Sequence, residues 1–122
     1  MTNYKKLEAW IISMELVREI YELTKTYPKE EMFGLTSQTK RAAVSIPCNI
    51  AEGLGRKNKK DTIQFLHISR RSADEVETLL NVALMTKIIN QEAYNQINQL
   101  LDRSMKLING LINYLQNQQA IN

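Results

Sequence analysis

The chain has 122 residues, 43% of them apolar and 24% charged, with a formal net charge of +3, which predicts one domain with one modest core. The single cysteine, Cys48, excludes an intrachain disulfide, and the longest apolar runs fall far short of the roughly 20 residues that span a bilayer. Because the chain also opens without a signal-peptide pattern, we expect a cytoplasmic protein with no membrane segment.

Four segments with helical periodicity are separated by three connections that hold most of the few glycine and proline residues. The first segment carries apolar residues at spacings of three and four over a face wide enough to contact two neighbouring helices. The predicted helices of this single domain, residues 1–122, cover residues 4–26, 36–54, 59–86 and 91–117.

The second predicted helix contains a proline within its apolar pattern. Pro47 lacks the amide that would donate to the carbonyl of Ala43, so we expect a kink or a break there. Hydroxyl residues that follow Gly34 are expected to cap the start of this helix. The glycines of residues 53–55 are interpreted as a helix stop followed by a loop.

The third and fourth predicted helices follow an apolar repeat of seven residues. Asn58 and Asn90 stand where each helix needs an N-cap. Gly110 weakens the fourth helix by roughly 1 kcal/mol relative to alanine, and we interpret it as the mark of a close helix contact. Residues 116–122 are expected to fray.

No strand pattern competes with these helices. Four long helices with short connections predict an all-α fold, an antiparallel up-down four-helix bundle whose second helix is kinked at Pro47. The apolar faces are wider than one small core requires, so we expect some of that surface to be buried between subunits of a homo-oligomer.

Positive charge is concentrated in the middle of the chain, where residues 40–71 hold eight basic side chains and two acidic ones. Such a cluster indicates an anionic partner, although a solvated loop has the same composition. Four of these residues adjoin a predicted helix start, where free amides and the helix dipole also favour anions, and these are Arg56, Lys57, Lys59 and Lys60. The residues that extend the surface are Lys40, Arg41, Arg70 and Arg71. Since no aromatic residue is interleaved with the basic loop, we predict contacts with backbone phosphates and no base stacking.

Residues for catalysis or metal binding are few. One cysteine and one histidine, far apart in sequence, do not make a zinc site, and Gln64 stands where a bundle di-iron site needs glutamate before His67. Cys48 is a candidate nucleophile only if His67 approaches it; a small buried cysteine is the commoner case. The glycines at 53 and 55 lack the rest of a phosphate-binding loop. We therefore expect no enzymatic activity, no metal and no cofactor.

Several runs closely resemble the signature of the small bundle proteins encoded in intervening sequences of bacterial 23S rRNA genes. The signature runs are residues 34–38 (GLTSQ), 41–47 (RAAVSIP), 49–53 (NIAEG) and 55–56 (GR). Residues 7–10 (LEAW), 65–66 (FL) and 75–78 (EVET) also resemble the family. The resemblance implies a four-helix bundle that assembles as a homopentamer. It also implies similarity to the basic accessory bundle proteins of retroelements, which work with a reverse transcriptase. Arg56 is the signature position that it suggests as a nucleic-acid contact.

Two functions therefore stay open at the level of the sequence. The first is a non-enzymatic oligomer that binds structured RNA or another nucleic acid through its central basic segment. The alternative is a protein-interaction scaffold or accessory subunit, for example for a reverse transcriptase, in which the charge only steers the encounter.

Overall fold

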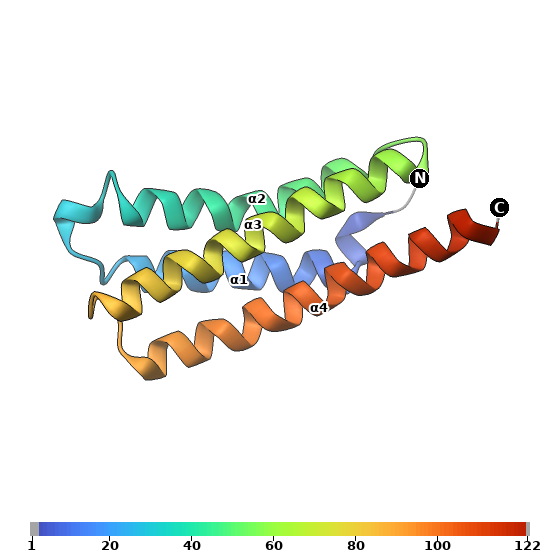
Figure 1. The fold of residues 1–122 in the computed structure, drawn as a ribbon. Coiled ribbons are helices and arrows are strands. Elements are labelled where there is room, and N and C mark those ends of the chain that lie inside the picture. Colours follow the sequence, from blue (N-terminus) through green and yellow to red (C-terminus); the bar gives the residue numbers. More distant parts are fainter. Residues whose placement is uncertain (1–2, 122) are drawn as a thin grey trace.

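The computed structural model describes residues 3–121, with side chains as far as Gln118. This part of the chain contains four α-helices, two short 3-10 helices and no strand. The four long helices lie side by side (Figure 1), with the α2–α3 connection at one end of the molecule and the other two connections at the opposite end. The elements are η1 (Tyr4–Lys6), α1 (Glu8–Thr24), η2 (Lys29–Glu31), α2 (Leu35–Leu54), α3 (Lys59–Met85) and α4 (Gln91–Ile121).

Two of the three predicted helix caps are confirmed. The side-chain oxygens of Asn58 and Asn90 each accept a hydrogen bond of 2.8 Å from the amide three residues further on. The start of α2 differs from the prediction, because no hydroxyl caps it. Instead Glu31 Oε1 accepts the amide of Leu35 at 3.3 Å, so the preceding 3-10 turn supplies the cap.

Helix boundaries differ from the predicted ones at both ends of the chain. Leu7 has extended backbone angles, φ −77° and ψ 132°, and separates η1 from α1. At the other end, α4 continues to Ile121 where fraying was expected, and Asn122 lies outside the described residues. Helix α2 runs through Pro47 without interruption, so the helix does not break there; a kink at this residue stays a prediction.

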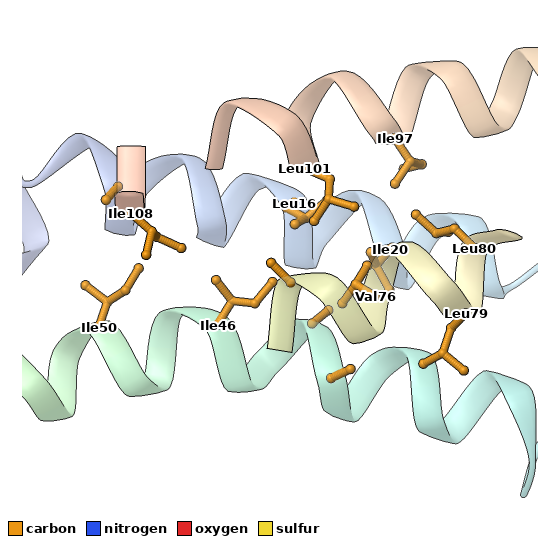
Figure 2. Close-up of a cluster of buried hydrophobic side chains, with 14 of the residues drawn as sticks. Leu16, Ile20, Ile46, Ile50, Val76, Leu79, Leu80, Ile97, Leu101 and Ile108 are labelled. Atoms are coloured by element: carbon orange, nitrogen blue, oxygen red, sulfur yellow. The ribbon is translucent and has the colours of Figure 1, made fainter. Parts of the chain in front are cut away.

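The core is formed by aliphatic side chains from all four helices (Figure 2). Burying one such side chain stabilises the fold by roughly 1.5–3 kcal/mol, so this cluster supplies most of the driving force for packing. Its fully buried members include Leu16 and Ile20 of α1, Ile46 and Ile50 of α2, Leu66, Val76 and Leu80 of α3, and Leu101 and Ile108 of α4.

Small and hydroxyl side chains bring α2 and α3 close together. The Ser69 hydroxyl donates to the carbonyl of Ile46 at 2.8 Å, and the hydroxyls of Ser45 and Ser72 lie 2.8 Å apart. Near the α2–α3 connection, a Cβ on Gly53 would lie only 2.8 Å from the nearest atom of α3. Because polar atoms of α3 bind α2 directly, these two helices hold their connection in a fixed position.

Candidate nucleic-acid interface

The candidate interface is the connection of residues 55–58 and the helix ends on both sides of it. Gly53, in the last turn of α2, is buried, and its carbonyl accepts a 2.8 Å hydrogen bond from the Thr62 hydroxyl in the first turn of α3. The Asn58 side chain caps α3 at the same place. The backbone of the connection is therefore anchored on both sides. Because it is already ordered, less conformational entropy is lost when its basic side chains bind an anion.

Three lysines of this connection are directed toward solvent. Lys57 and Lys60 are exposed and Lys59 is partly exposed. Among residues 3–121, the ion pairs involve none of the three. Asp61 is the acidic residue nearest to them in sequence, and its carboxylate interacts with the Asn58 side-chain amide at 3.3 Å. These three ammonium groups are thus available to a phosphate.

Arg56 is held by two neighbours. Its Nη2 lies 3.2 Å from Oε2 of Glu52, one turn earlier on α2, and its guanidinium carbon lies 4.6 Å from the centre of the Phe65 ring on α3. The cation–π contact and the ion pair hold the guanidinium between Glu52 of α2 and Phe65 of α3. A phosphate that approached Arg56 would compete with the Glu52 carboxylate, so we place Arg56 second to the lysines.

The other four predicted residues lie away from the connection. Lys40 and Arg41 are in the first half of α2, and Arg70 and Arg71 in the middle of α3, about 16–21 Å along the helices from the connection at 1.5 Å per residue. They therefore do not form a continuous patch with residues 56–60, and a ligand must extend along the bundle to reach both groups.

Two of these four are engaged by neighbouring helices. Lys40 Nζ lies 4.7 Å from the centre of the Tyr21 ring on α1, and Arg70 Nη1 donates to Asn109 Oδ1 on α4 at 3.3 Å. Arg41 and Arg71 are exposed.

Two basic residues at this end of the bundle were not predicted from the sequence. Lys5 and Lys6 belong to η1, which packs against α2 and lies toward the end of the bundle that carries the α2–α3 connection in Figure 1. Together, residues 4–6 and 51–61 carry six basic and two acidic side chains, a net charge of +4. We call this surface the basic end. Residues 6 and 51 are 45 positions apart, so the sequence alone does not show that these two segments lie at the same end of the bundle. The packing of η1 against α2 shows it.

The histidine and the cysteine lie outside the basic end. Burial, followed by the charges of Arg70 and Arg71, lowers the pKa of His67, so it adds no positive charge at neutral pH. Cys48 is exposed, in contrast to the buried position that is common for cysteine. Within residues 3–121 no group of three or more His, Cys, Asp and Glu side chains is arranged to hold a metal ion. None of the helices described is long and apolar enough to cross a bilayer.

These features define the chain as a four-helix protein with an anchored, positively charged end. Its residues 5–110 match the model of the 23S rRNA-intervening sequence protein family. The match covers most of the chain, so the protein belongs to that family. A search of curated proteins finds no match.

Solved structures support the same assignment. A crystal structure of a protein of unknown function from the S23 ribosomal protein family of Bacteroides thetaiotaomicron is similar to this chain, with a TM-score of 0.79 and 28% identity. The similarity covers 85% of this chain and 97% of that one.

Proposed function

We propose that this protein is a non-enzymatic, cytoplasmic bundle protein that binds RNA or another nucleic acid through its basic end. The observation that carries the proposal is the net charge of +4 on residues 4–6 and 51–61, drawn from two segments far apart in sequence. A cluster assembled from separate segments and anchored by Thr62 and Asn58 is less expected of a loop whose charges only maintain solubility.

The contacts in this proposal are mainly with phosphates. Lys57, Lys59 and Lys60 are the primary contacts, because they are free of ion pairs among the described residues. Arg56 joins them when it exchanges Glu52 for a phosphate oxygen. The four basic residues that lie away from the connection would contact a ligand long enough to continue along the helices. These residues are Lys40, Arg41, Arg70 and Arg71.

We also propose that the chain assembles as a homo-oligomer, a pentamer as the family resemblance implies, built from antiparallel bundles with α2 bent at Pro47. Large apolar side chains remain exposed in a single copy, which supports self-association. They include Ile11 and Tyr21 on α1 and Ile68 on α3. Assembly would repeat the basic end around the oligomer and increase its avidity for a polyanion.

Fluorescence anisotropy with a labelled RNA hairpin tests the proposal. The test variant changes Lys57, Lys59 and Lys60 to Gln; Arg56 is retained because it packs on Phe65. The matched control removes the same charge from the opposite end of the bundle by changing the lysines of its two connections to Gln, namely Lys25, Lys29 and Lys87.

We expect tight binding at low salt for the wild type and the control, and a loss of at least tenfold in affinity for the test variant, at an unchanged mass by light scattering. Equal losses in the two variants would indicate nonspecific attraction to net charge. Absence of binding by the wild type at low salt would contradict the proposal.

A second candidate function is a protein-interaction scaffold, and the end opposite the basic end favours it. Phe33 is 93% exposed, Met32 beside it 52% and Met85 75%. Met32 and Phe33 belong to the α1–α2 connection and Met85 is the last residue of α3, before the α3–α4 connection; the two connections lie at the same end of the bundle in Figure 1. A group of exposed large apolar side chains at one end of a bundle is typical of a site that contacts another protein.

The double variant of Met32 and Phe33 to Ser separates the two roles of that apolar end. If it serves self-association, the variant lowers the mass measured by light scattering. If it binds another protein, the mass stays the same while affinity purification with the variant loses partners that the wild type retains.

A further inference from the structure

An apolar groove lies between η1, α1 and α2, beside the basic end. Its volume is about 360 Å³, which falls within the range of roughly 300–1,000 Å³ found for small-ligand pockets. The lining is formed by Tyr4, Trp10, Met14, Val17, Val44, Pro47, Cys48 and Ala51. No acidic or basic side chain contributes to it, so an uncharged, flat or apolar group is the expected occupant.

Two aromatic rings stand at the end of the groove nearest the basic end. The ring centres of Tyr4 and Trp10 lie 5.6 Å apart in an edge-to-face arrangement, with an angle of 67° between the ring planes. Both side chains are only partly buried. Aromatic rings that are partly open to solvent and already fixed by each other can receive a stacked ring at low entropic cost.

Positive charge borders the groove at both ends. Lys5 and Lys6 follow Tyr4 directly, and the lysine-rich connection begins a few residues after Ala51. At the far end, one turn beyond Val44 on α2, Lys40 lies over the Tyr21 ring. An occupant of the groove therefore has cations on either side, as a base with flanking phosphates requires.

We infer that this groove receives an unstacked base, so that the nucleic acid bound at the basic end is single-stranded or has unpaired nucleotides. The inference rests on the proposed function and narrows its substrate class. Proteins that bind unpaired strands combine a basic track with aromatic residues on which bases stack, and a duplex keeps its bases inside the stack. The sequence-based expectation of phosphate contacts alone is then incomplete, because the aromatic residues come from the N-terminal segment.

The chain contains a single tryptophan, Trp10, whose fluorescence reports on the groove. Trp10 emission and the anisotropy of a labelled strand are measured together for an oligoadenylate of about 12 nucleotides and for the same strand in a duplex. We expect the single strand to quench Trp10 emission at saturation and the duplex to leave it unchanged.

Substitutions at the groove give the second readout. Tyr4→Leu and Trp10→Leu should each weaken single-strand binding by roughly 5- to 100-fold, the effect of losing one stacked base, with little change for the duplex. Trp10→Phe should restore part of the loss. Tyr114→Leu, which removes an exposed aromatic ring from α4, is the control and should bind like the wild type. Tyr4 lies outside the four long helices, so its variant keeps the test valid if the Trp10 variants fold poorly.

The outcomes are distinguishable. Binding of the single strand with unchanged Trp10 emission and an unchanged affinity of Tyr4→Leu would overturn the inference and leave the proposed function standing. If neither nucleic acid binds, both fail. Emission that depends on protein concentration and not on the strand would show that a second copy occupies the groove, which also overturns the inference.

Discussion

Gly53 and Gly110 both lie inside helices, and replacing each with alanine should change stability in opposite directions. A Cβ built on Gly53 would lie 2.8 Å from Cβ of Phe65 and 3.1 Å from the backbone oxygen of Thr62. Neither atom can rotate away, so α2 and α3 must separate. Overpacking of this kind costs about 1–3 kcal/mol, against a gain of up to about 1 kcal/mol in helix propensity. The 2.8 Å hydrogen bond from Thr62 to Gly53 would also lengthen, for about another 1 kcal/mol.

The alanine variant of Gly110 is the matched control. A Cβ at this position would meet no atom within 4 Å, so the variant gains roughly 0.5–1 kcal/mol of helix propensity without strain. Thermal unfolding followed by circular dichroism, at one protein concentration, should place the Tm of Gly110→Ala about 10 °C above that of Gly53→Ala, at roughly 4 °C per kcal/mol. Equal Tm values, or a more stable Gly53→Ala, would refute the close helix contact.

Three further predictions concern single side chains. The hydroxyl of Tyr27 is buried without a hydrogen-bond partner among the described residues, so Tyr27→Phe should stabilise the fold by about 1 kcal/mol in urea unfolding at neutral pH. Burial raises the pKa of Tyr27 to about 12 from 10.0, so the wild type should lose stability as the pH rises from about 10 to 12, and Tyr27→Phe should lose less. Lys87 has φ 66°, which strains any side chain, so Lys87→Gly should raise the Tm by about 4 °C while Lys87→Ala does not. Glu52→Gln should free Arg56 and tighten RNA binding severalfold in anisotropy; weaker binding would show that the ion pair positions Arg56 for the ligand.

The helices were predictable because their apolar spacing and asparagine caps are local signals. The third helix shows this most clearly, since Asn58 caps it as expected and α3 ends within one residue of the predicted boundary. The start of α2 was not predictable in detail, because its cap comes from Glu31 in a preceding turn rather than from the hydroxyls of the helix itself.

The interpretation of the glycines shows what the sequence lacks. The predicted helix stop at residues 53–55 is confirmed, because α2 ends at Leu54 and Gly55 is its C-cap residue; the sequence did not show that Gly53 is also buried against α3. Gly110 was interpreted as a close helix contact, and this is wrong, because it faces open space. Both occur in helical patterns, and only the position of the neighbouring helix distinguishes them.

Only part of the candidate site could be predicted from the sequence. Residues 56–60 form a local cluster that composition reveals. The addition of Lys5, Lys6 and the Tyr4–Trp10 pair depends on how η1 folds onto α2, and so does the contact of Arg56 with a ring from α3. Such long-range contacts are not encoded in any periodicity.

The salt dependence of RNA binding tests the central claim most directly, because each phosphate contact contributes to its slope. For a single strand, the logarithm of the affinity should fall against the logarithm of salt concentration by about 0.7 per contact. If Lys57, Lys59 and Lys60 bind phosphates, their replacement with Gln should make the slope shallower by about 2, while the control at Lys25, Lys29 and Lys87 keeps the wild-type slope. An equal slope in both variants would contradict the assignment of phosphate binding to the basic end.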